Sequence, residues 1–292
     1  MAFLHYLRLK VEASLVRLAF RWKLEPSLTK QDEVLQLPSR DPGRTIKVNS
    51  YRARAEKPTP VLVNFHGSGF IVPWHGTDDE FARRVVQATD YAVLDVAYRL
   101  APENPFPAAI HDVEDVVKWV ISNPQDFDPS YISISGFSAG ANLALVASSQ
   151  LFPKETFRHV ICFYPPTDLA KDHSSKVPPD PNGSPLPPWM LNIFTECYAS
   201  GLDWSDPKIS PINATADKFQ KNTLFFTCDR DNLCPEGEDL VQKLRDTHGD
   251  DAIMHRRMEN CDHAWDKSYK AGTPQEKAKD EAYDLAMELL RR

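Results

Sequence analysis

The chain has 292 residues and 42% hydrophobic content, enough to bury the core of one large domain or two small ones, so a largely disordered chain is excluded. Lys and Arg total 34 and Asp and Glu total 41, and the resulting net charge of -7 excludes binding to nucleic acid that is driven by the overall charge of the protein. The five cysteines are an odd number and none form a C-x-x-C pair. We therefore expect a reduced, cytoplasmic protein without a structural metal.

The first 23 residues predict an amphipathic helix. No uncharged run reaches the roughly 20 residues that a membrane-spanning helix needs, and none forms the apolar centre of a signal peptide. Apolar side chains recur at helical spacing, with basic residues behind them: Leu4, Leu7, Val11, Leu15, Leu18, Ala19 and Trp22. We expect this apolar stripe to pack on the protein itself. The alternative is a helix that lies on an anionic membrane surface.

Short β-rich runs then alternate with helical patterns. The predicted strands are Thr45–Ala53, Pro60–Gly67, Tyr91–Tyr98, Tyr131–Gly136, His159–Tyr164, Thr223–Cys228 and Ala252–Met258. The predicted helices are Asp78–Thr89, Pro107–Ser122, Ala139–Gln150, Glu236–His248 and Pro274–Arg292. Near-continuous apolar strands that alternate with helices indicate an α/β architecture, a mostly parallel sheet covered on both faces. The six prolines of Lys176–Pro188 predict a surface loop.

In such folds the functional groups follow the carboxyl ends of the strands. One predicted strand runs into Gly136-Phe137-Ser138-Ala139-Gly140 and then directly into a helix. This is the G-x-S-x-G pattern in the strand-turn-helix context that gives the pattern its meaning. The turn places the Ser138 hydroxyl at a helix N-terminus, where free N–H groups favour a developing negative charge. The pattern therefore predicts a nucleophile at Ser138.

A second strand ends in His66-Gly67-Ser68-Gly69-Phe70, whose small residues let backbone N–H groups approach a ligand. Donors aimed at a tetrahedral oxyanion contribute roughly 3 to 4 kcal/mol each. A dinucleotide-binding turn would need glycine at the position of Val72 and a helix directly afterwards. We therefore predict an oxyanion loop.

A nucleophilic serine needs a base, and the base needs an orienting acid. Asp229 and Asp231 follow one predicted strand, and His263 follows the next. Both turns belong to the same rim of the predicted sheet. The chain order of serine, aspartate and histidine is the one that α/β-hydrolases use.

Together these motifs resemble the hormone-sensitive-lipase family of α/β-hydrolases, which includes arylacetamide-deacetylase-like esterases. The loop at His66–Phe70 resembles the family's H-G-G-G, and Tyr98–Glu103 resembles its Y-R-L-A-P-E segment. The motifs FYPPTDL, D-N-L and His263 follow in family order, so the resemblance covers roughly Thr45–Trp265. It implies an α/β-hydrolase fold over residues 45–292, with a helical cap built from residues 1–44 and an insertion at about 168–206.

The resemblance also implies roles for individual residues. Ser138 would be the nucleophile, His263 the general base, and Asp231 the orienting acid, with Asp229 as the alternative. The oxyanion hole would be formed by Gly67, Ser68, Gly69 and Ala139. Candidates for lining the substrate pocket are Phe70, Phe137, Trp189, Met190 and Phe194. Departures from the family pattern stand at Ser68, Phe137, Ala141 and Pro235.

The expected function is hydrolysis of small-molecule carboxylic esters with short to medium acyl groups through an acyl-enzyme. No metal or organic cofactor is expected. An amidase or deacetylase of the same mechanism is one alternative, and a non-catalytic small-molecule receptor on the same fold is another. The presence of all three residues Ser138, Asp231 and His263 argues against the receptor. The sequence does not decide between a monomer and a homodimer.

Overall fold

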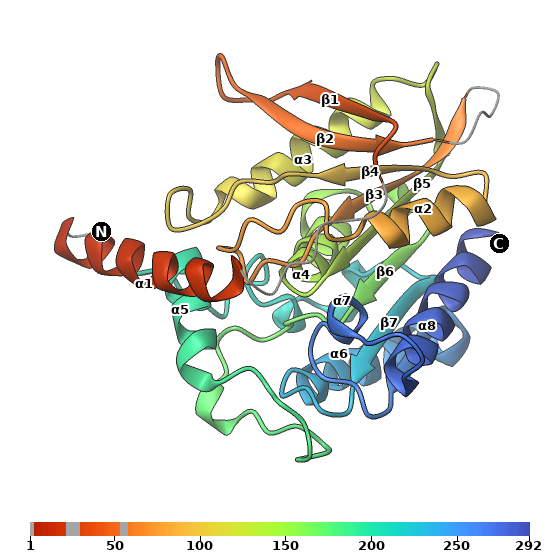
Figure 1. The fold of residues 1–292 in the computed structure, drawn as a ribbon. Helices are drawn as coiled ribbons and strands as arrows, with labels where there is room; N and C mark the ends of the chain where they lie inside the picture. Colours follow the sequence, from red (N-terminus) through yellow and green to blue (C-terminus); the bar gives the residue numbers. More distant parts are fainter. Residues whose placement is uncertain (1–2, 22–29, 53–57) are drawn as a thin grey trace.

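In residues 3–21, 30–52 and 58–292, which the computed structural model describes, eight strands form one sheet in the order β1-β2-β4-β3-β5-β6-β7-β8 (Figure 1). The strands are β1 (Glu33–Pro38), β2 (Thr45–Tyr51), β3 (Thr59–Phe65), β4 (Ala92–Val96), β5 (Phe127–Phe137), β6 (Val160–Phe163), β7 (Thr223–Cys228) and β8 (Ile253–Met258). The pairs β1–β2 and β2–β4 are antiparallel, and the other neighbours are parallel. The turns after β3, β5, β7 and β8 therefore meet at one edge of the sheet.

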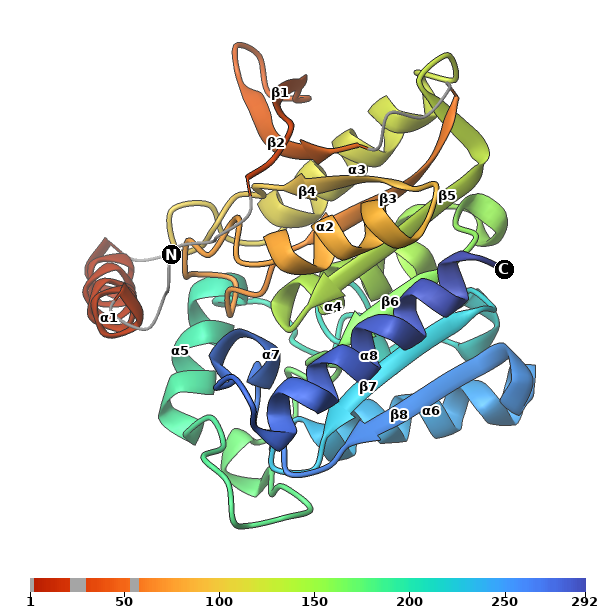
Figure 2. The same ribbon diagram turned by 45° about the vertical axis from the view of Figure 1, so that its right-hand side comes forward.

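Helices cover both faces of the sheet (Figure 2). They are α1 (Phe3–Arg21), α2 (Asp79–Ala88), α3 (Ala108–Ile121), α4 (Ala139–Val146), α5 (Pro188–Ala199), α6 (Cys234–His248), α7 (Trp265–Ser268) and α8 (Pro274–Leu290). One apolar core joins α3, α4 and α6 to one face, and a second joins α2 and α8 to the other. Burial on both faces explains why β3, β4, β6 and β7 are apolar almost throughout.

The predicted α/β architecture is confirmed, and each strand and helix predicted between residues 45 and 292 is present. Strand β1 was not predicted, and it lies in the range 1–44 that was expected to form only cap helices. It pairs with β2 from Glu33↔Ser50 to Pro38↔Thr45. The connecting turn contains Gly43 at φ 76, a conformation that glycine adopts without steric strain. Residues 33–38 therefore belong to the sheet.

Helix α1 forms as predicted, but its opposite face packs on the protein. Leu9, Ala13 and Val16 are buried against a cluster that includes Ile71 and Cys197. The predicted stripe instead faces solvent from Leu4 to Leu18, and Trp22 lies outside the described residues. The expectation that this stripe is buried is wrong, because the helix carries apolar residues on both sides. In the described ranges no helix combines the length and apolar character needed to cross a membrane.

Candidate active site

Ser138 lies in a sharp turn between β5 and α4, with φ 50 and ψ -120. A positive φ is strained for a residue other than glycine, and the surrounding packing maintains it here. A Cβ at Gly136 would overlap the carbonyl oxygen of Gly140, and a Cβ at Gly140 would overlap the carbonyl oxygen of Phe65. The two glycines of the motif therefore let β5, α4 and the end of β3 approach closely enough to form the turn.

Replacing Gly140 with alanine is expected to reduce the free energy of unfolding by about 3 kcal/mol, because the new methyl group has no space against rigid backbone. Denaturant titration measures this loss. The matched control is Gly237→Ala in α6, where the nearest atom to an added Cβ is the Thr227 methyl carbon at 3.2 Å. Equal stability losses in the two variants would contradict the assigned role of Gly140.

Ser138, His263 and Asp231 form one hydrogen-bonded chain. The Ser138 Oγ lies 2.8 Å from His263 Nε2, and His263 Nδ1 lies 2.6 Å from Asp231 Oδ2. An ionised carboxylate can only accept, so Nδ1 carries the proton and Nε2 is left to accept the proton of the serine hydroxyl. Asp231 is only 1% exposed, and its other oxygen accepts from the Leu233 N–H at 3.0 Å. The carboxylate is therefore fixed at both oxygens.

Asp229 is placed differently. Its carboxylate accepts from the backbone N–H groups of Asn260 at 2.9 Å and Cys261 at 3.2 Å. These bonds hold the turn that leads to His263, and the imidazole bonds Asp231 instead. Asp229 thus shapes the histidine turn, whereas Asp231 orients the histidine ring.

The loop Gly67–Gly69 lies against the serine turn. A Cβ at Gly67 would be 3.6 Å from Ser138 Cβ, which shows how closely the two segments approach. Gly69 has φ 52 and Phe70 has φ 62, whereas Ser68 lies outside the left-handed region, so serine replaces the family's glycine there without strain. Among the described residues, no protein acceptor is found for the N–H groups of Ser68 and Gly69. The N–H of Ala139, at the start of α4, likewise lacks an intrahelical partner.

Tyr98 holds this loop in place through hydrogen bonds and ring stacking. Its hydroxyl donates to the carbonyl oxygen of His66 at 2.6 Å and lies 2.7 Å from Ser68 Oγ, which in turn accepts from the Phe70 N–H at 2.8 Å. The rings of Tyr98 and His66 stack with centroids 4.5 Å apart. Burial lowers the pKa of His66 to about 3, so this imidazole is neutral at physiological pH. Both side chains therefore hold the loop in position.

Removal of the Tyr98 hydroxyl in Tyr98→Phe is expected to lower kcat for ester hydrolysis by about tenfold or more, because the loop that carries the Ser68 and Gly69 N–H groups loses the bonds that align it. Steady-state kinetics on p-nitrophenyl acetate measure the change. A shift confined to KM, with kcat unaltered, would argue against this alignment role. Tyr91→Phe removes another buried tyrosine hydroxyl, which bonds Ser133 at 3.2 Å outside the loop, and serves as the control.

The candidate pocket residues occupy different environments. The Phe194 ring is the one in contact with the loop, since a Cβ at Gly69 would be 2.7 Å from it. Phe70 is buried and stacks on Tyr198, whereas Trp189 is 57% exposed and Met190 is half-buried. Phe137 does not line an open pocket: it is fully buried in the core and stacks on Phe163 with centroids 4.3 Å apart. Phe81 of α2 also packs edge-on against it, with ring centroids 5.3 Å apart.

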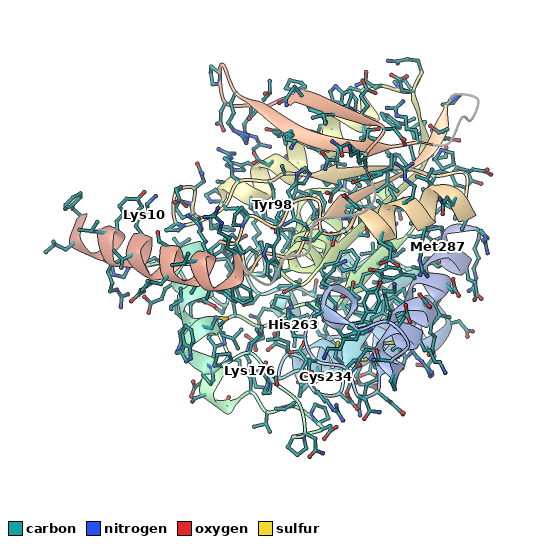
Figure 3. All side chains as sticks on the ribbon, viewed as in Figure 1. Lys10, Tyr98, Lys176, Cys234, His263 and Met287 are labelled. Atoms are coloured by element: carbon teal, nitrogen blue, oxygen red, sulfur yellow. The ribbon has the colours of Figure 1, made fainter. Side chains whose placement is uncertain are left out.

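The proline-rich loop 176–188 contacts both turns that carry the acid and the histidine, which the sequence pattern did not predict. Asp180 pairs with Arg230 at 2.8 Å, and the Asn232 side chain donates to the Leu186 carbonyl at 2.8 Å. The Ser184 N–H donates to Asp262 at 2.6 Å, one residue before His263. Figure 3 labels Lys176, the first residue of this loop, and His263. The loop therefore bridges the acid turn and the histidine turn.

Two buried groups behind the site were also missed. Tyr164 lies edge-on to the His263 ring at 4.8 Å and donates its hydroxyl to Asp266 at 2.7 Å. Lys176 and Glu236 form a buried ion pair at 2.5 Å. Tyr164 lies in the FYPPTDL segment, but that motif does not indicate a contact with the histidine, and Lys176 belongs to no motif. Within the described ranges, no group of three or more His, Cys, Asp or Glu side chains could hold a metal ion.

The chain matches a family model described as alpha/beta hydrolase fold over residues 62–267. The carboxylic ester hydrolase LipN of Mycobacterium tuberculosis is 30% identical over 224 residues, which cover 73% of this chain and 59% of LipN. The ethyl acetate hydrolase of Pseudomonas putida is 28% identical over 219 residues, which cover 72% of this chain and 68% of that enzyme. The match to LipN thus spans less than two thirds of its length.

Solved structures agree with the sequence comparison. The esterase of Pyrobaculum calidifontis superimposes with a TM-score of 0.77 at 26% identity, covering 96% of this chain and 92% of the esterase. The thermostable carboxylesterase EstE1 from a metagenomic library gives 0.76 at 25% identity, covering 98% and 95%. The chain therefore belongs to the alpha/beta hydrolase family, as its resemblance to the hormone-sensitive-lipase group predicts.

Proposed function

We propose that the protein is a carboxylesterase that cleaves small-molecule esters through an acyl-enzyme on Ser138. The observation that carries this proposal is the hydrogen-bonded chain from Asp231 through His263 to Ser138. Beside it lie the N–H groups of Ser68 and Gly69, which have no protein acceptor among the described residues. The names of the relatives, carboxylic ester hydrolase and ethyl acetate hydrolase, support an ester as the substrate.

In the proposed mechanism, His263 Nε2 takes the hydroxyl proton as Ser138 Oγ attacks the ester carbonyl. Asp231 stabilises the resulting imidazolium through its bond to Nδ1. The N–H groups of Ser68, Gly69 and Ala139 would bind the oxyanion of the tetrahedral intermediate. His263 then gives its proton to the departing alcohol, which leaves the acyl-enzyme. In the second half, His263 takes a proton from water as the water attacks the acyl-enzyme, and then returns it to Ser138 Oγ as the carboxylic acid leaves.

The proposed cap combines α1 with the insertion at about 168–206, which contains α5. Phe194 of α5 lies against Gly69, so an aromatic ring limits the space beside the oxyanion donors. This position supports short to medium acyl groups, and ethyl acetate hydrolase is named for a substrate of that size. The five cysteines, all free and buried, fit the reducing cytoplasm as the proposed location.

The test is labelling with a fluorophosphonate, followed by turnover of matched esters and anilides of acetic, butyric and octanoic acid. A carboxylesterase is expected to become labelled at one serine and to cleave acetyl or butyryl esters fastest. Faster cleavage of the anilides would identify an amidase of the same mechanism. The absence of both labelling and turnover would favour a receptor on the same fold and would refute the proposal.

A further inference from the structure

Helix α1 carries apolar side chains on two opposite faces. Leu9, Ala13 and Val16 face the rest of the protein and are buried. The outer face carries five side chains that are between 49% and 77% exposed: Leu4, Leu7, Val11, Leu15 and Leu18. Their spacing places them on one side of the helix over its whole length. We call these five residues the outer stripe; contiguous exposed apolar surface of this kind marks an interaction site.

The rest of the protein holds α1 with the outer stripe facing away. Lys10 and Arg17 both pair with Glu103, at 2.6 and 2.7 Å, and Arg8 pairs with Glu196 of α5. The hydrogen bond from Arg17 lowers the pKa of Glu103 to about 2, so the pair stays charged at neutral pH. In both ribbon views α1 lies at the edge of the molecule (Figures 1 and 2), and in Figure 1 its N-terminal half extends past α5. The stripe is therefore accessible to a large flat partner.

The charge of α1 points to an anionic partner. The helix contains Arg8, Lys10, Arg17 and Arg21 but a single acidic residue, Glu12, in a chain whose net charge is -7. Arg8 stays 50% exposed in its ion pair and Arg21 is exposed, so pairing two copies of α1 would bring these cations together, which opposes self-association. An anionic surface attracts the same residues. Charge complementarity thus favours an anionic lipid surface over a second copy of the chain.

We propose that α1 is an interfacial helix whose outer stripe inserts among the headgroups of an anionic lipid surface. Arg8 is one turn from Leu4 and Val11, Lys10 is one turn from Leu7, and Arg21 is one turn from Leu18, so cations flank the stripe on both sides. Arg8 and Lys10 are 50% and 35% exposed in their surface ion pairs, which contribute little to stability, so these side chains can exchange Glu196 and Glu103 for lipid phosphates while the leucines enter the apolar boundary. The helix lies along the surface and does not span it.

The experiment is co-flotation of the full chain with vesicles of phosphatidylcholine, with or without phosphatidylglycerol. Binding to the anionic vesicles is expected to be about tenfold or more stronger than binding to the neutral vesicles. It is expected to weaken in about 0.5 M salt, which shortens the screening length to a few ångströms. If the full chain does not float with anionic vesicles at low salt, the proposal is overturned.

The matched variants place the same charges on different exposed apolar residues. Leu7→Glu with Leu15→Glu is expected to lower vesicle binding about tenfold or more, because two carboxylates would enter the apolar boundary. Val177→Glu with Leu202→Glu, at positions 64% and 46% exposed outside α1, is expected to change binding less than about twofold. Equal losses in both pairs would show bulk charge repulsion and overturn the assignment to the stripe.

Melting temperatures of both pairs check that the fold is retained, because all four positions are exposed. Light scattering on the same samples tests whether a second copy of the chain, and not a lipid surface, covers the outer stripe. A dimer that Leu7→Glu with Leu15→Glu converts to a monomer, with no vesicle binding by the parent chain, would show that a second copy covers the stripe. That outcome would refute the lipid proposal.

Discussion

Replacing Ser138 with alanine is expected to lower kcat for ester hydrolysis by about 10⁵-fold or more and to abolish fluorophosphonate labelling. The hydroxyl is the atom that His263 Nε2 contacts at 2.8 Å, and alanine offers no nucleophile in its place. Any residual hydrolysis should come from direct attack of water on the bound ester, helped only by substrate binding and by the N–H groups proposed to stabilise the oxyanion. Single-turnover kinetics and intact-mass analysis after labelling measure the two effects.

Ser138→Ala should leave folding nearly unchanged, because it removes one hydrogen bond worth about 1 kcal/mol and leaves the turn glycines in place. The control is Ser174→Ala, which alters an exposed serine that bonds Asp172, and this variant should retain full labelling. If the Ser138 variant were still labelled at another serine and turned over ester at a comparable rate, Ser138 would not be the nucleophile.

Asp231→Asn is expected to lower kcat by about 10⁴-fold with little change in KM. The asparagine oxygen can still accept from the Leu233 N–H, which turns its NH₂ group toward His263 Nδ1. The imidazole must then carry its proton on Nε2, where it cannot accept the serine proton, and its cation loses the carboxylate that stabilises it. Stopped-flow measurement of acylation separates this loss from any change in substrate binding.

Asp229→Asn makes the same chemical change two residues earlier and is the control for Asp231→Asn. The Asn260 and Cys261 N–H groups bond different oxygens of Asp229, so the single oxygen of asparagine keeps one of these two bonds and the histidine turn should change only slightly. We expect a loss of less than about tenfold in kcat, since Asp229 does not bond the imidazole. A larger loss than for Asp231→Asn, at equal stability, would reverse the two roles.

The site could be predicted from the sequence wherever one local motif carries the chemistry. The turn at Ser138 needs glycine two residues before and two residues after it, because the backbone segments approach closely there, and the G-x-S-x-G pattern shows both glycines in the sequence. For the acid, the resemblance of D-N-L to the family motif favours Asp231, but position alone leaves Asp229 open, because both residues follow β7. The choice depends on two N–H groups from a distant turn that hold Asp229, a tertiary contact without a local signature.

The fold was predictable where burial on both faces makes the strands apolar, and less so at its edges. Strand β1 has a single buried side chain, Leu37, so its apolar content did not distinguish it from a loop. In α1 the periodicity indicates a helix, but two opposite faces are apolar and local pattern cannot say which one packs. The packed face is decided by Ile71 and Cys197, which lie far along the chain.

The contacts of loop 176–188 have a consequence for protein engineering. This loop lies inside the proposed cap insertion, yet Asp180, Ser184 and Leu186 bond residues of the turns that carry Asp231 and His263. Grafting the insertion of a relative onto this chain would therefore replace residues that line the proposed pocket. It would also replace residues that bond the turns of Asp231 and His263. A chimera that keeps these three contacts should change substrate preference alone, whereas one that lacks them should also turn over every ester more slowly.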